Sequence, residues 1–250
     1  MIRAKKSLGQ NFLVDKNIID KIINTVSITD NEILEVGPGT GNLTKEILKK
    51  GPNKMYLIEK DTILAKSLRE TVDERVKIFN EDILKFDENS LSKKKIKVFG
   101  NLPYNISTEI LSNWIINLKK EYWFTDLVLM FQKEVADRII AKSNTSAYGR
   151  LSILANWRLN INKICDISPE SFSPRPKIQS TLIHFTPKIK FVKIKNPINL
   201  EKITRIFFSH RRKMLKKPFN QIFNGKTDLL NKFNLDLNLR PQNLDFDTYY

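Results

Sequence analysis

The chain has 250 residues, a length that suits one large domain or a domain of roughly 180 residues followed by a smaller one. Its 43 Lys and Arg against 27 Asp and Glu leave a net charge of +16, which favours polyanionic partners such as nucleic acid. One cysteine, two histidines and no apolar run of membrane-spanning length argue against disulfides, a structural metal and a membrane location, so we expect a cytoplasmic protein.

The N-terminal part begins with an irregular arm, Ser7 to Leu13. Apolar residues at helical spacing after Asp15, a good capping residue, predict a helix over 15–26. A short apolar run at 33–36 then predicts a buried strand, and it leads through a glycine-rich turn at 37–41 into a helix at 42–50.

Strands and helices continue to alternate after this unit. Strands are predicted at 55–59, 76–79, 96–99 and 127–131, and helices at 62–72, 108–120 and 134–142. Two further strands at 159–167 and 180–185, separated by a proline-rich loop, predict an antiparallel edge. The alternation indicates a parallel, doubly wound sheet.

Past Pro187 the sequence becomes basic and helix-prone, so we expect a domain boundary within 186–197. Between Lys188 and Lys217 there are eleven basic residues and one acid, Glu201, which strengthens the expectation of a nucleic-acid partner. A smaller run that includes Lys93 and Lys94 is typical of a solvated loop.

The glycine-rich turn could let a ligand approach the backbone and the amides of the following helix. Its spacing is G-x-G-x-G, without the third glycine position of a dinucleotide fingerprint. Glu59 ends the second strand, where its carboxylate could accept from both hydroxyls of a ribose, and Asp82 follows the third strand, where it could accept from an adenine amine. The ordinary alternatives are a structural turn, an exposed Glu59 paired with Lys60, and an N-cap at Asp82.

The sharpest signal is Asn101-Leu102-Pro103-Tyr104, directly after the fourth strand. The exocyclic amine of adenine is a poor nucleophile because its lone pair is delocalised into the ring. The Asn101 side-chain oxygen and a backbone carbonyl beside Pro103 could hold both amine hydrogens and favour attack on a methyl group, while Tyr104 stacks on the base. A sulfonium donor needs no general base, so positioning would dominate the rate. The alternative is a proline turn that caps the next helix.

With these motifs in place, the chain resembles the KsgA-type ribosomal RNA adenine dimethyltransferases of the small subunit, which share a fold with macrolide-resistance methylases of the large subunit. The resemblance covers nearly the whole length. Its motifs are Ser7 to Leu13, Glu35 to Gly41, Glu59-Lys60-Asp61, Asp82, Asn101 to Tyr104, Tyr148 to Leu151, Phe172 to Pro176 and Arg211-Arg212-Lys213.

The resemblance implies S-adenosylmethionine (SAM) as the cofactor and no metal. The matched cofactor residues are Asn11, Leu13, Gly37, Glu59, Asp82 and Asn101. It further implies that Phe172 sandwiches a flipped base against Tyr104, although either aromatic residue could instead belong to the core. The arm from Gln10 to Leu13 resembles a lid over the cofactor, with an ordinary loop as the alternative.

Three basic residues are expected to contact RNA phosphates: Arg211, Arg212 and Lys213. The alternative is that they are exposed charges that only keep the surface of a helix soluble. The predicted fold is α/β: a Rossmann-like SAM-dependent methyltransferase domain over residues 1–185, followed by a small helical, basic domain over 186–250 that binds RNA or the ribosome. The family usually carries a further C-terminal helix where this chain stops, so we expect a truncated C-terminus.

The reaction implied by the resemblance is N6,N6-dimethylation of two adjacent adenosines near the 3′ end of 16S rRNA, in the 30S subunit or its precursor. We expect a monomer with a role in small-subunit maturation. Three alternatives stay open: a large-subunit resistance methylase, a non-catalytic ribosome-assembly factor, and a nicotinamide-dependent oxidoreductase. The arm at 9–13, the segment 148–151 and the basic C-terminal part favour the small subunit over the large one.

Overall fold

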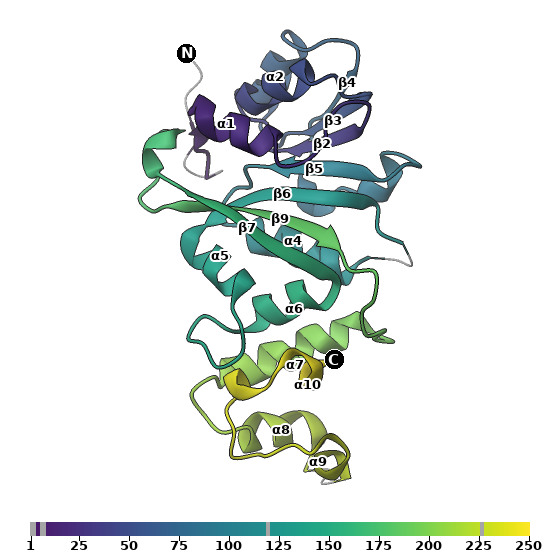
Figure 1. Cartoon of the computed structure of the whole chain (residues 1–250), viewed down its shortest axis with the longest axis vertical. Coiled ribbons are helices and arrows are strands. Elements are labelled where there is room, and N and C mark those ends of the chain that lie inside the picture. The colour runs from purple at the N-terminus through teal and green to yellow at the C-terminus, as the bar shows by residue number, and fades with distance from the viewer. Residues whose placement is uncertain (1–3, 6–8, 119–120, 226–227) are drawn as a thin grey trace.

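A seven-stranded sheet lies at the centre of the molecule (Figure 1). The computed structural model describes residues 4–5, 9–118, 121–225 and 228–250. The strand order is β4-β3-β2-β5-β6-β9-β7. The first five strands in this order are parallel to one another, and β9 is antiparallel to both β6 and β7. The strands are β2 (Glu32–Val36), β3 (Lys54–Ile58), β4 (Val76–Phe79), β5 (Ile96–Gly100), β6 (Phe124–Gln132), β7 (Leu159–Ile167) and β9 (Ser180–Pro187). The predicted parallel sheet and its antiparallel edge are confirmed.

Helices cover both faces of this sheet. They are α1 (Lys16–Ile23), α2 (Asn42–Lys49), α3 (Thr62–Arg69), α4 (Ser107–Ile116), α5 (Lys133–Ile140) and α6 (Arg150–Arg158). Buried residues of α1 and α2 pack in one hydrophobic cluster, and those of α4, α5 and α6 pack in the other. Asp15 caps α1 as predicted, because its carboxylate accepts from the amides of Asn17 and Ile18. No helix in the described part of the chain is long and apolar enough to cross a membrane.

Helix α6 is absent from the sequence-based prediction. Most of its residues are buried, including Leu151, Ile153, Leu154 and Trp157. Two of its polar residues, Ser152 and Arg158, are buried as well. Polar and apolar residues are therefore not separated onto opposite faces, and the one-sided periodicity that reveals a surface helix is missing.

A small second sheet joins two segments that the sequence analysis expects to be irregular. β1 (Phe12–Leu13) pairs antiparallel with β8 (Phe172–Ser173), and Leu13 lies opposite Phe172. The amide of Val14 extends the contact by donating to the carbonyl of Ser171 at 2.9 Å. The N-terminal arm is therefore attached to the loop between β7 and β9.

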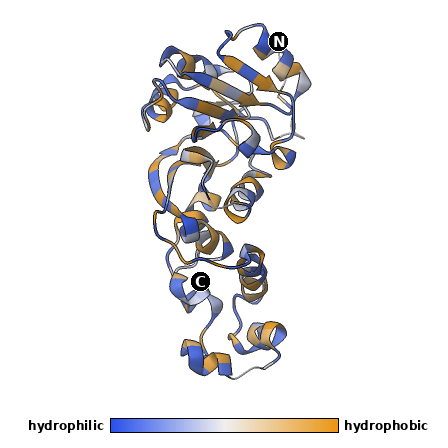
Figure 2. Cartoon of the chain, turned by 90° about the vertical axis from the view of Figure 1, so that its right-hand side faces the viewer, coloured by the Kyte–Doolittle hydropathy of each residue, from blue (hydrophilic) through white to orange (hydrophobic). Residues whose placement is uncertain are grey.

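The C-terminal helices lie beyond α6, at the far end of the molecule from β4 (Figure 1). They are α7 (Pro197–Ser209), α8 (Lys216–Phe223), α9 (Asp228–Phe233) and α10 (Phe246–Tyr249). Hydrophobic and hydrophilic residues alternate along them (Figure 2). Leu200, Phe207, Leu215 and Tyr249 belong to the same buried cluster as α4 to α6, so one core runs from the sheet into these helices. The division into two domains near residue 186 stays a prediction.

Candidate active site

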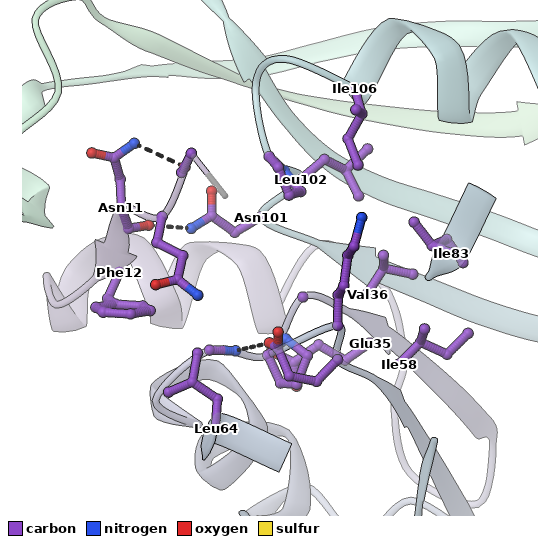
Figure 3. A pocket seen from close by; sticks show the side chains of 18 of the residues that line it. Asn11, Phe12, Glu35, Val36, Ile58, Leu64, Ile83, Asn101, Leu102 and Ile106 are labelled. Atoms are coloured by element: carbon purple, nitrogen blue, oxygen red, sulfur yellow. Dashed lines mark hydrogen bonds between the residues drawn. The ribbon is translucent and has the colours of Figure 1, made fainter. Parts of the chain in front are cut away.

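A pocket opens at the carboxyl ends of β2, β3 and β5 (Figure 3). The strand order reverses between β2 and β5, which is where doubly wound sheets bind ligands. The six residues that the sequence analysis assigns to the cofactor all line this pocket: Asn11, Leu13, Gly37, Glu59, Asp82 and Asn101. Leu102, Pro103 and Tyr104 line it as well. The fold thus brings together residues from distant parts of the sequence.

The glycine turn between β2 and α2 forms one wall of the pocket. Gly37, Gly39 and Gly41 have φ angles of 69°, 58° and 79°, which residues with side chains rarely adopt. A Cβ atom on Gly39 would also lie 2.8 Å from the ring of Phe12 in the N-terminal arm. Because α2 begins here without a side-chain cap, its first backbone amides can donate hydrogen bonds to an anionic ligand.

Glu59 lies directly after β3, with its carboxylate beside the glycine turn. It is 6% exposed and accepts from the backbone amides of Gly39, at 3.1 Å, and Asp61, at 2.8 Å. Burial raises the pKa of Glu59, and the two amides oppose that shift. The alternative of an exposed Glu59 paired with Lys60 is wrong, because Glu59 is buried and Lys60 pairs with Asp82.

Asp82 lies between β4 and a one-turn 3₁₀ helix, Ile83–Lys85. Its carboxylate accepts from the amide of Leu84 at 3.1 Å and from Lys60 Nζ at 2.8 Å. The hydrogen bond from Lys60 lowers the pKa of Asp82. The N-cap interpretation of Asp82 is therefore confirmed, and the same residue also lines the pocket.

Glu35 is a pocket residue that the sequence analysis quotes in a motif without giving it a role. It lies within β2, is 2% exposed and accepts from the hydroxyl of Thr44 at 2.7 Å. Burial raises the pKa of Glu35 to about 8; the Thr44 hydroxyl opposes this shift and the charge of Glu59 adds to it. Glu35 therefore carries a proton at neutral pH. Its signal in the sequence is an acid between the apolar residues Leu34 and Val36.

We predict that Glu35→Gln removes a pH-dependent loss of stability. Because folding raises the pKa of Glu35 from 4.5 to about 8, the stability that this group contributes is fully present below pH 4.5 and is lost as the pH rises through 8. Relative to Glu35→Gln, the unsubstituted protein should lose up to roughly 3 kcal/mol of unfolding free energy between about pH 5 and pH 8. Urea unfolding at several pH values measures this difference, and an identical pH dependence for both proteins would contradict it.

Asn101 follows β5 and is held by the N-terminal arm. Its Nδ2 donates to the backbone carbonyl of Asn11 at 2.8 Å (Figure 3). An amide whose nitrogen is engaged in this way presents its oxygen, Oδ1, as an acceptor. Asn101 Oδ1 can therefore accept a hydrogen bond from a ligand, and the role that the sequence analysis gives this residue stays a prediction.

Of the two carbonyls at the proline turn, that of Leu102 can accept from a ligand. The carbonyl of Pro103 is occupied, because it accepts from the amides of Ile106 and Ser107 at 3.1 and 3.0 Å and so begins α4. Among the described residues no hydrogen bond reaches the Leu102 carbonyl. The Leu102 side chain, 1% exposed, lies so close to Gly100 that a Cβ there would be 2.8 Å away. The tetrapeptide therefore both begins a helix, as its alternative interpretation states, and lines the pocket.

The N-terminal arm crosses the pocket and is fastened at several points. Asp61, 4% exposed, receives Lys5 Nζ at 2.9 Å and Gln10 Nε2 at 3.2 Å, and it also caps α3. The carbonyl of Leu13 accepts from Asn42 Nδ2 at 2.8 Å. These specific hydrogen bonds and the ion pair hold the arm in place beside the pocket. Ser7 and Leu8, part of the predicted arm, lie outside the described residues.

Phe172 lies in the hydrophobic core. It is 3% exposed, packs in the same cluster as Leu13, and is absent from the described residues that line the pocket. Tyr104 does line the pocket. The core alternative therefore describes Phe172 in this structure, and a base held between Tyr104 and Phe172 stays a prediction.

The predicted phosphate-binding residues divide into two groups. Arg211 is turned toward the protein: its guanidinium donates to the carbonyls of Thr145 and Ser146 and to Gln242 Oε1. Arg212 and Lys213 instead line an open groove between the end of α7 and α8. Sequence reasoning cannot separate them, because all three are adjacent cations.

The chain is similar to known sequences over nearly its whole length. The family model for ribosomal RNA adenine dimethylase matches residues 1–249. Ribosomal RNA small subunit methyltransferase A of Pelagibacter ubique (strain HTCC1062) is 62% identical over 249 residues, covering 100% of this chain and 95% of that protein. The protein of the same name from Wolbachia sp. subsp. Drosophila simulans (strain wRi) is 41% identical over 258 residues, with 100% and 92% covered.

Solved structures with the same fold include two transferases. A dimethyladenosine transferase from Plasmodium falciparum is 26% identical and superposes with a TM-score of 0.78, covering 95% of this chain and 94% of that one. The 23S rRNA methyltransferase ErmE is 20% identical, with a TM-score of 0.69 and 96% of each chain covered. The second likeness concerns the fold alone.

Proposed function

This chain belongs to the ribosomal RNA adenine dimethylase family, and we propose that it dimethylates the N6 amines of two adjacent adenosines near the 3′ end of 16S rRNA, in the 30S subunit or its precursor. The observation that carries this proposal is the pocket in which Asn101, Leu102 and Glu59 meet. The names of the relatives, which specify the small subunit, favour this substrate over 23S rRNA. We further propose that the enzyme acts as a monomer in the cytoplasm during small-subunit maturation.

The donor set of the pocket fits SAM. The buried Glu59 carboxylate suits ribose hydroxyls, the first amides of α2 suit a carboxylate, and Asp82 suits an adenine amine beside the apolar Ile83. When bound, this cofactor supplies an electrophilic methyl group on a sulfonium. The N-terminal arm, through Asn11 and Leu13, would cover the bound cofactor.

The tetrapeptide would act by holding the amine. Asn101 Oδ1 and the Leu102 carbonyl can each accept one N6 hydrogen, which keeps the nitrogen lone pair out of the purine ring and aimed at the methyl group. Attack by this lone pair on the sulfonium methyl group would place the methyl group on N6, with the thioether as the leaving group. The extra proton on the amine becomes acidic only then and passes to water, so the rate depends on alignment.

The experiment that tests this function is transfer of tritiated methyl groups from SAM to 30S subunits that lack the modification. Mass spectrometry of the digested RNA should then yield N6,N6-dimethyladenosine. Protein-free 23S RNA serves as the competing substrate. Transfer to 23S RNA alone would overturn the proposed substrate, and no transfer to either would overturn the proposed activity.

RNA docking is assigned to a basic groove in the C-terminal helices. Its lining residues are Arg212, Lys213, Met214, Lys216, Lys217, Asn220, Asn238 and Arg240. Five of these are cations, and none of the described lining residues is acidic. A one-sided charge of this kind suits a phosphate backbone. We assign phosphate contacts to Arg212 and Lys213. Arg211 instead anchors the start of this basic segment through its hydrogen bonds to the carbonyls of Thr145 and Ser146.

We predict that Lys216→Glu/Lys217→Glu raises the KM for 30S subunits by about tenfold or more and lowers the salt slope of binding by about two. Both lysines are exposed in the groove, so the change should spare folding and SAM affinity. Lys93→Glu/Lys94→Glu is the matched control, because it makes the same charge change in an exposed loop. Equal losses in the two variants would mean that net charge, and not the groove, governs docking.

A further inference from the structure

We propose that Ser180 is a positioning residue for Tyr104 and thereby fixes the orientation of the target base; this rests on the function proposed above. The phenol oxygen of Tyr104 and Ser180 Oγ share a hydrogen bond of 2.5 Å, although the residues are 76 positions apart. Tyr104 ends the tetrapeptide that lines the pocket, and Ser180 is the first residue of β9. The bond therefore links the base-binding segment directly to the antiparallel part of the sheet.

Ser180 is a rigid point of attachment. It is 0% exposed, and it lies between two strands, opposite Gln132 of β6 and Ile167 of β7. The neighbouring Thr181 links β9 to β7 through its side chain as well, because its hydroxyl donates to the Asp166 carboxylate at 2.7 Å. A hydroxyl on backbone that is paired on both sides moves little, so it can define the place of the phenol oxygen.

The bond constrains the Tyr104 ring at its far end. Rotation about χ1 displaces the phenol oxygen, so the hydrogen bond to Ser180 opposes it directly. Rotation about χ2 leaves that oxygen in place but turns the ring plane, and the phenol O–H prefers to lie in this plane, so a fixed Ser180 partner also favours one ring orientation. The near end is fixed by the turn that begins α4, where Ser107 Oγ donates to the Tyr104 carbonyl at 3.3 Å. Burial raises the pKa of Tyr104, so its hydroxyl keeps the proton at neutral pH and stays able to donate.

Alignment of the amine depends on this ring. A base that stacks on Tyr104 takes the plane of the ring, whereas the two acceptors, Asn101 Oδ1 and the Leu102 carbonyl, are fixed by the backbone and the arm. A ring free to tilt would still bind a base but would present N6 to those acceptors for a smaller share of the time. The loss should therefore fall on kcat rather than on KM.

The test is a double-mutant cycle on methyl transfer to 30S subunits with Ser180→Ala, Tyr104→Phe and both together. We expect each single variant to lose roughly threefold to tenfold in kcat, with KM changed by less than about twofold. The double variant should lose no more than either single one, because both remove the same bond. SAM affinity and melting temperature, measured alongside, identify any loss of folding. Tyr104→Phe alone carries the test should Ser180→Ala fail to fold.

Thr186→Ala is the matched control, since it removes a hydroxyl from the same strand, and among the described side chains this hydroxyl is hydrogen-bonded only to Asn160. It should keep full kcat. An unchanged kcat in Ser180→Ala or Tyr104→Phe, or losses that multiply in the double variant, would overturn the positioning role while leaving the proposed function intact. If the unsubstituted protein transfers no methyl group to 30S subunits, both proposals fall.

Discussion

Replacing Asn101 by alanine should lower kcat for methyl transfer by on the order of a thousandfold while binding to 30S subunits persists. The variant removes the Oδ1 acceptor, so N6 keeps only the Leu102 carbonyl to hold its hydrogens. Docking should survive because the basic groove lies in the C-terminal helices, away from the tetrapeptide. Tritiated-methyl transfer measures the first effect and filter binding the second.

Asn101→Asp separates the two atoms of this amide. It keeps an acceptor oxygen but loses the Nδ2 donor, and it sets a carboxylate against the Asn11 carbonyl, which now lies 2.8 Å from that nitrogen. We expect kcat to fall less than in Asn101→Ala, because an acceptor oxygen remains. SAM affinity should fall more, because the carboxylate repels the Asn11 carbonyl and displaces the N-terminal arm. Asn160→Ala, at an exposed position of β7, is the control and should be fully active. Undiminished transfer by Asn101→Ala would remove Asn101 from the mechanism.

Glu59→Gln should raise the Kd of SAM by about a hundredfold or more, since two hydrogen bonds to a charged acceptor are worth about 1.5–3 kcal/mol each. The substitution also sets an NH₂ group against one of the two backbone amides, those of Gly39 and Asp61, that the carboxylate now satisfies. Isothermal titration calorimetry measures the Kd, and the melting temperature of the apo protein reports on folding.

Glu46→Gln is the control for this substitution, because Glu46 lies on α2 and pairs only with Lys49 among the described side chains. It should bind SAM normally. The raised pKa of Glu59 adds a second signature: lowering the pH should weaken SAM binding to the unsubstituted protein at a higher pH than an ordinary glutamate would require. The same affinity in Glu59→Gln and Glu46→Gln would contradict the ribose role of Glu59.

The strands and helices that the sequence predicts well are those with a regular pattern and clear boundaries. β4 and β7 begin and end at the predicted residues, and Asp15 marks the start of α1. β1 and β8 are missed because two-residue strands are too short to show a period, and their pairing joins segments about 160 positions apart. Helix α6 is missed for a different reason, because its polar and apolar residues are both buried and are not separated onto opposite faces.

For the pocket, motif order predicts which residues meet but not what they contact. The six residues that the sequence analysis assigns to the cofactor line one pocket together with the tetrapeptide, and their contacts with a cofactor stay a prediction. The sequence could not tell that Phe172 packs in the core, that Arg211 is turned inward, or that Asp61 holds the arm, because each depends on a partner far along the chain. Ser180 has no local signal at all, since its role arises only from the crossing of β9 and the tetrapeptide.

The tight packing of Gly100 on Leu102 has an evolutionary consequence. A methyl group at position 100 would press on both Leu102 and Leu129, and any relief would shift Leu102, whose carbonyl we propose as an acceptor for the amine. Homologues with a larger residue at position 100 should therefore carry a smaller one at 102 or 129. These sites should vary together as the family diverges, with the glycine lost only in lineages that have already compensated for it.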